Sequence, residues 1–388
     1  MKTSPLLGFG FWVSVVGVMF SPRGFWGRHK RKILIGLGVV GGGYAIYRLW
    51  DSHQRNMLEL DRQKEREKQE EELMKIQLKN HFESIQRISD TTTLPYAMHE
   101  LRARILERLD LSELRDRLMQ GKGQPGVLSP QERIELWGRL KILSFTRTVA
   151  ALWAVTILSL YVRIQVNVLG RHLYLDIART AEEQDNSDSL SSHGREEFLA
   201  TADYLCTHGI NMLLVNMQSA AMEVLKEKQL KDTFSIDQLR ETITQILDLF
   251  MKSEGSTYWV SYLVPEDVST YRKIMASSSS SYELTNLMDT SKLEELMSET
   301  RTILLRPDFG KVMNIAMEKA VELLIDEMSP EVSGTAPLAL AKLLPRVSQM
   351  SIPLLAEPEN NELISTLRRI PEIEVFYTLV YADLTLES

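Results

Sequence analysis

The sequence predicts an all-α protein, an elongated helical bundle with one very long central helix, preceded by an N-terminal transmembrane helix and a charged helical stalk. Three observations predict it: a helix-start signal followed by some forty residues without a strong break, a separate, almost uncharged segment of eighteen residues, and a dense run of Glu, Lys and Gln between them. We expect an extension with a basic flank at 1–32, a transmembrane helix at 33–50, a stalk at 51–87 and a helical-bundle domain at 88–388.

Composition sets the class of protein and of partner. The 388 residues include 44% hydrophobic and 25% charged ones, which is ordinary for a globular chain. The first fifty residues carry seven basic residues and no acidic one, so the overall net charge of −7 leaves −14 for the rest. An acidic body repels phosphate backbones, which argues against nucleic acid as a partner. The single cysteine and the lack of any Asn-x-Ser/Thr sequence fit a body in the reducing cytosol.

The segment 33–50 is the predicted membrane anchor, because it is uncharged from Ile33 to Tyr47 and ends in aromatic residues. Eighteen helical residues span about 27 Å, close to the roughly 30 Å of a bilayer core. Its five glycines would make a poor soluble helix. The basic residues that flank and target this anchor are Arg28, Lys30, Arg31 and Lys32. A second apolar run at 6–20 leaves open an extra membrane segment or a different start of the chain.

The long central helix has the clearest start signal. Ser129, Pro130 and Glu132 form a capping-box pattern, and a helix of some forty residues, about 60 Å long, should follow. Within it, the fifteen residues 148–162 are uncharged. That run is short for a membrane span, so we expect the buried core of a bundle, with a second span as the alternative.

The other helices are predicted from apolar periodicity and from turn residues. Residues 253–290, which include a serine run, are expected to be rich in loops. The expected helices are 95–109, 111–119, 198–230, 236–251, 291–305, 307–328, 336–351 and 373–381.

Catalytic and metal-binding patterns are missing from the sequence. A Gly-x-Gly-x-x-Gly string starts at Gly36 but lies in the predicted anchor, and another starts at Gly121 in a loop between two helices. Neither has the strand that a dinucleotide site needs. The seven histidines are scattered, and none pairs with a cysteine at metal spacing. We therefore expect no enzyme activity, no cofactor, no metal and no small-molecule substrate.

Trp137 is the candidate contact residue. On a helical wheel it lies about 100° from the predicted core stripe, next to Arg133, Ile134 and Lys141. A tryptophan edged by cations suits an acidic amphipathic helix, because the indole buries apolar surface while the charges orient the guest. From the residues alone, a second interpretation is equally good: Trp137 is a half-buried residue at the boundary of the core, and its neighbours merely cover it. The core stripe consists of Leu136, Leu140 and Leu143.

Several long strings resemble the peroxin 3 family. They are IELWGRLKILSFTR (134–147), RIQVNVLGRHLYLD (163–176), RHKRKI (28–33), HFESIQR (81–87) and PLALAKLLPRV (337–347). The resemblance covers roughly residues 23–388 and implies a single-pass peroxisomal membrane protein with a short N-terminus towards the matrix. It also leaves open a first passage through the endoplasmic reticulum. The helical domain would face the cytosol and dock peroxin 19, the chaperone-receptor for newly made peroxisomal membrane proteins.

The same resemblance implies where the partner binds. An amphipathic helix of peroxin 19 would lie in a hydrophobic groove near one end of the bundle, and Trp137 would be the anchor. The expected partner-binding residues are Trp137, Arg133, Ile134, Leu140, Lys141 and Lys342, with Leu114 or Leu118 as the groove leucine.

Two features depart from the family. Residues 1–22 are additional, and the basic cluster lies on the matrix side, opposite to the positive-inside rule for translocon insertion. The alternative function is that of an organelle tether or membrane scaffold.

Overall fold

The computed structural model describes residues 80, 83, 86–87, 89–123, 129–180, 192–252, 255, 257–278, 290–332 and 337–382. The expected membrane anchor, most of the stalk and the basic residues Arg28, Lys30, Arg31 and Lys32 lie outside these residues.

The described part of the chain is all-α, as the sequence predicts, with one ribbon of two very short strands. The elements, in chain order, are η1 (Ser89–Thr93), α5 (Leu94–Arg108), α6 (Ser112–Gly123), α7 (Pro130–Thr180), α8 (Ser192–Ala200), η2 (Leu205–Gly209), α9 (Ile210–Leu225), β1 (Thr233–Phe234), α10 (Ile236–Lys252), η3 (Tyr258–Tyr262), α11 (Val268–Ser278), α12 (Thr290–Leu304), α13 (Pro307–Val332), β2 (Leu338–Ala339), α14 (Leu340–Gln349), α15 (Ser351–Leu354), η5 (Pro358–Asn360), α16 (Glu362–Leu367) and α17 (Pro371–Ala382).

Helix α7 begins at the predicted capping box. The backbone N–H of Glu132 donates to Ser129 Oγ at 3.2 Å, and the Ser129 N–H donates to Glu132 Oε2 at 2.8 Å. Pro130 occupies the first helical position, where its missing N–H costs nothing. The helix has 51 residues, longer than expected, and is therefore about 75 Å long.

The middle of α7 is the core of the bundle. Every residue from 148 to 162 is buried. The helix is apolar and long enough to cross a membrane, yet its apolar window is completely covered by the other helices. The structure therefore confirms the reading of 148–162 as a buried central helix.

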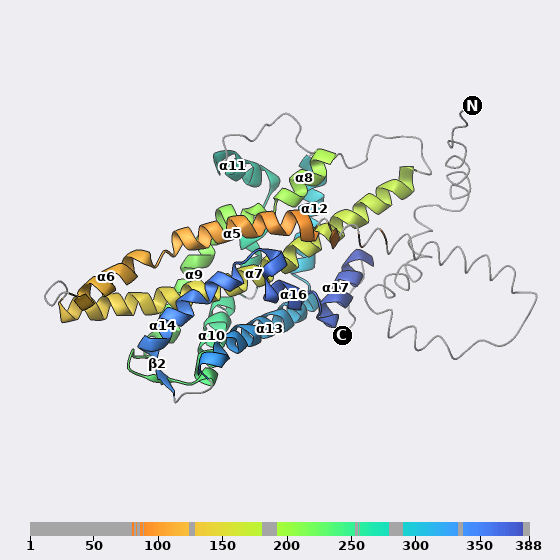
Figure 1. Ribbon diagram of the computed structural model, residues 1–388. Helices are drawn as coiled ribbons and strands as arrows, with labels where there is room; N and C mark the ends of the chain where they lie inside the picture. Colours follow the sequence, from red (N-terminus) through yellow and green to blue (C-terminus); the bar gives the residue numbers. More distant parts are fainter. Residues whose placement is uncertain are drawn as a thin grey trace, which may run out of the picture.

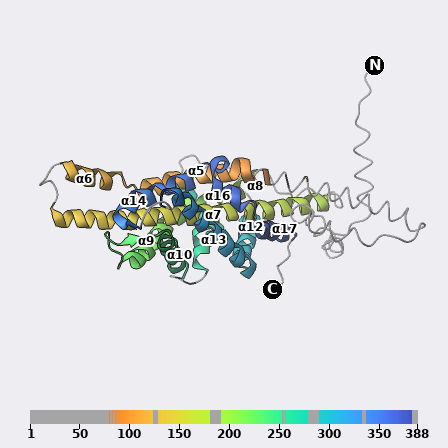
Figure 2. The same cartoon turned by 60° about the horizontal axis from the view of Figure 1, so that its bottom comes forward.

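The remaining helices surround α7 in an elongated molecule (Figures 1 and 2). Helices α5, α9, α12, α13, α14 and α17 pack against its length, and α6 lies back along its first turns as a helical hairpin. The C-terminal end of α9 and the N-terminal end of α14 meet near the α6–α7 hairpin. There β1 and β2 pair Thr233 with Ala339 and Phe234 with Leu338.

Two predicted helices differ from the structure. The expected helix 198–230 is divided into the end of α8, the π-helix η2 and α9, and Gly209 at the end of η2 lies close to the Tyr262 backbone. The region 253–290, expected to be rich in loops, contains η3 and α11 among its described residues. The helix expected at 336–351 starts only after β2, whereas α10, α12 and α17 match their predicted ranges within three residues.

Candidate functional site

Trp137 lies at the junction of two hydrophobic clusters. It is partly buried and packs against both the main core and a smaller cluster in the α6–α7 hairpin. The smaller cluster consists of Leu111, Leu114, Leu118, Leu136 and Leu140, and Leu143 packs against it. The ring is therefore neither sealed in the interior nor fully in solvent, which both a contact residue and a boundary tryptophan predict.

The helical neighbours of Trp137 differ in exposure. Arg133, one turn earlier, is exposed, and Ile134 is 62% exposed. Residues three and four apart on a helix share one face, so Arg133 and Ile134 both adjoin the indole. We call these three residues, Arg133, Ile134 and Trp137, the Trp137 surface. A single exposed isoleucine is ordinary on a protein surface, but this one lies next to a partly buried tryptophan on the same face of α7.

The predicted leucines lie beneath this surface. Leu114 and Leu118 are each 8% exposed, and Leu140 is 4% exposed. Here they fill the α6–α7 hairpin and support Trp137 from below. On α6, Met119 is 65% exposed and adds a second apolar side chain to the outside of the hairpin.

Lys342 is exposed on α14, two residues after the helix begins. Helix α14 lies along α7 (Figure 1), and its Val347 carbonyl accepts a hydrogen bond from Thr148 Oγ1. The start of α14 therefore lies towards the same end of the bundle as Trp137.

Lys141 does not point outward with the other predicted contact residues. Its Nζ donates to the carbonyls of Leu225 at 2.8 Å and of Lys228 at 2.6 Å. Burial lowers the pKa of this lysine, and the charge of Asp232 partly opposes the shift. No local sequence signal could have found this role, because the acceptors are 84 and 87 residues away.

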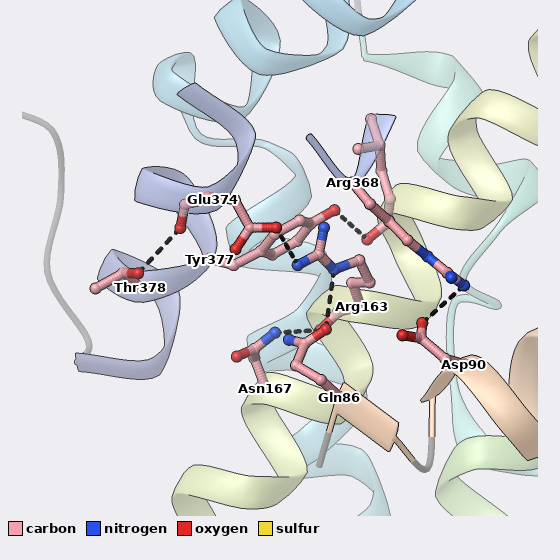
Figure 3. A network of polar contacts seen from close by, with 9 residues as sticks. Gln86, Asp90, Arg163, Asn167, Arg368, Glu374, Tyr377 and Thr378 are labelled. Atoms are coloured by element: carbon pink, nitrogen blue, oxygen red, sulfur yellow. Dashed lines mark hydrogen bonds and ion pairs between the residues drawn. The ribbon is translucent and has the colours of Figure 1, made fainter. Parts of the chain in front are cut away.

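A cluster of polar side chains around Arg163 lies further along α7 (Figure 3). The guanidinium of the buried Arg163 donates to Glu374 Oε1 at 2.8 Å and to Gln86 Oε1 at 3.2 Å, and lies 4.2 Å from the ring centre of Tyr377. Arg368 Nη2 pairs with Asp90 at 2.9 Å. The network thus ties the chain at 86–90 to α7 and to the C-terminal helices.

A small hollow beside this network does not match the predicted groove. It lies next to Arg163 rather than next to Trp137. Burial raises the pKa of Asp90, while the cations of Arg368 and Arg163 oppose that shift. Arg163 pairs with Glu374 and Arg368 pairs with Asp90, so the positive and negative charges of the cluster are equal in number. We interpret the cluster as a structural contact between these segments.

Comparison with known proteins identifies the family. A family model described as Peroxin-3 matches residues 122–383, more than half of the chain. The chain belongs to the peroxin-3 family. Peroxisome biogenesis protein 3-1 of Arabidopsis thaliana is 42% identical over 365 residues, 93% of this chain and 98% of the relative. Peroxisomal biogenesis factor 3 of Homo sapiens is 27% identical over 314 residues, 78% of this chain and 77% of the relative.

Membership of the peroxin-3 family gives the chain a role in peroxisome biogenesis. This is a family of biogenesis factors rather than of enzymes, and it implies the peroxisomal membrane as the place of action. The resemblance seen in the sequence is thereby confirmed at the level of the family.

Proposed function

We propose that this member of the peroxin-3 family is a membrane-anchored docking receptor for peroxin 19 that enables the insertion of peroxisomal membrane proteins. Residues 33–50 cross the bilayer, 51–87 form the stalk, and 88–388 are the cytosolic domain. The basic cluster Arg28–Lys32 lies at the matrix end of the anchor. An amphipathic helix of peroxin 19 binds at the Trp137 surface.

The observation that carries this proposal is the exposure of Ile134 next to the partly buried Trp137, above a leucine cluster. A guest helix that covers both side chains removes apolar surface from water at the edge of an existing core. Arg133 and Lys342 supply positive charge, which steers an acidic guest and fixes its orientation. Leu114, Leu118 and Leu140 support the contact from beneath.

The test is a calorimetric titration of the full-length protein in nanodiscs with peroxin 19. Truncating a central interface tryptophan costs about 2 kcal/mol or more, so Trp137→Ala should weaken binding roughly thirtyfold. Because Trp137 is only partly buried, the helical circular dichroism should change little.

Tyr96→Ala is the matched control, since Tyr96 is an aromatic residue on α5 with 59% exposure. It should bind peroxin 19 like the unaltered chain. If Trp137→Ala also binds with unchanged affinity, the docking surface lies elsewhere and the tether function becomes the better account.

A further inference from the structure

A lysine from another helix binds the backbone at the end of α9, where the Leu225 carbonyl also accepts from the Lys228 N–H at 3.2 Å. The last carbonyls of a helix have no partners within it, and the negative end of the helix dipole favours a cation. Lys141 of α7 provides that cation, with Nζ 2.8 Å from the Leu225 carbonyl and 2.6 Å from the Lys228 carbonyl. Two of its three donors are used by the backbone of α9 and of the loop that follows.

That loop in turn holds the start of α14. The N–H of Leu340 donates to the Asp232 carbonyl at 2.9 Å, and the N–H of Ala341 donates to the Leu230 carbonyl at 2.9 Å. The Asp232 carboxylate closes the loop on itself by accepting from the Gln229 N–H at 2.7 Å. The pairing of β1 with β2 extends the same connection over the next two residues.

Together these contacts connect the two parts of the proposed docking site, which are Trp137 on α7 and Lys342 on α14. Trp137 lies one turn before Lys141 on α7, and Lys342 directly follows Ala341 on α14. In Figure 1, α14 rises from β2 and lies along α7, and the loop contacts α14 at its first two residues, Leu340 and Ala341.

We propose that Lys141 is a positioning residue that ties the 226–234 loop to α7 and thereby sets the start of α14, with Lys342, relative to Trp137. The ammonium does not contact the partner. Its importance for docking rests on the proposed function, whereas the structural connection itself can be measured without a partner.

The experiment uses the full-length protein in nanodiscs and the variant Lys141→Met, which keeps the apolar stem and removes the ammonium. Hydrogen exchange at the amides of Leu340 and Ala341 reports on the connection. Because bonds from a charged donor are strong, both amides should exchange about tenfold faster. Binding of peroxin 19 should weaken by a similar factor, since the two halves of the site are no longer held together.

Two further variants separate this role from a general loss of stability. Lys141→Arg keeps a cation at this position and should retain slow exchange and most of the affinity. Asp232→Ala removes the hydrogen bond that closes the loop but keeps the Lys141 ammonium, and it should reproduce both effects of Lys141→Met. Lys226→Met is the matched control, because the Lys226 side chain is 70% exposed at the same end of α9 and should affect neither measurement.

The outcomes are decisive for each claim. Unchanged exchange at Leu340 and Ala341 in Lys141→Met overturns the connection, and a loss of affinity alone would mean that Lys141 contacts the partner directly. Faster exchange with unchanged affinity overturns the positioning role in docking. If the unaltered chain does not bind peroxin 19, the proposed function fails, and the exchange rates alone still decide whether Lys141 holds the loop.

Discussion

The buried charge of Arg163 lies where segments distant in sequence meet. Arg163 is 7% exposed and pairs with Glu374 across 211 residues. Its guanidinium also contacts Gln86 and the face of Tyr377. A buried charge is tolerated only when its partners are present, so removing one member leaves the other uncompensated.

Arg163→Met should therefore lower the free energy of unfolding by about 3 kcal/mol, because the carboxylate of Glu374 loses its counter-charge. Urea denaturation of the full-length protein measures this change. Arg104→Met is the control, since the Arg104–Glu107 pair is exposed and should contribute at most about 0.5 kcal/mol. Adding Glu374→Leu to Arg163→Met removes the unpaired carboxylate and should recover part of the lost stability. If the double variant recovers none of it, the loss is not caused by the unpaired charge.

At the scale of elements, two glycines on helices have opposite surroundings. A Cβ on Gly209 would collide with the backbone carbonyl of Tyr262, where η2 and α9 cross η3. A Cβ on Gly138, in α7, would meet no atom within 4 Å beyond its own turns of helix. Gly209 is required for close packing, whereas Gly138 only adds conformational entropy to the unfolded chain.

Gly209→Ala should lower stability by roughly 1–3 kcal/mol, because α9 and η3 must move apart. Gly138→Ala should raise it by about 0.5–1 kcal/mol. Thermal unfolding of both variants, followed by circular dichroism, gives the comparison. Equal shifts in the same direction would contradict the difference in packing.

The elements that the sequence predicted well are those with local signals. The capping box at Ser129 placed the start of α7 correctly, since both of its hydrogen bonds join residues three apart. The expected helix 198–230 is interrupted before α9, where Gly209 packs against the distant Tyr262 backbone, and sequence periodicity does not show such a long-range contact. The same reason explains why the π-helix η2 and the β1–β2 pair were missed.

For the candidate site, helical spacing predicts that Arg133 and Ile134 lie beside Trp137 on one face of α7. In the structure Arg133 and Ile134 are exposed and Trp137 is partly buried, and their part in binding stays a prediction. The role of Lys141 could not be predicted, because its acceptors on α9 and in the next loop come close only in the folded chain.

At the scale of the whole molecule, α7 connects the two regions described above. The chain at 86–90 joins α7 at Arg163, and Trp137 lies 26 residues earlier on the same helix. At about 1.5 Å per residue the separation is about 39 Å. Under the proposed function, the rigid central helix holds the docking surface at a constant distance from the point where the membrane-side chain enters the bundle.

The most direct test of the docking surface is a site-specific photo-crosslink from position 134 of the full-length protein in nanodiscs. A benzophenone amino acid at Ile134, whose side chain is 62% exposed, should crosslink peroxin 19, and mass spectrometry should place the link within an amphipathic helix of the partner. The same probe at Val375, 40% exposed on α17, should give no link. Crosslinking from position 375 and none from position 134 would contradict the account.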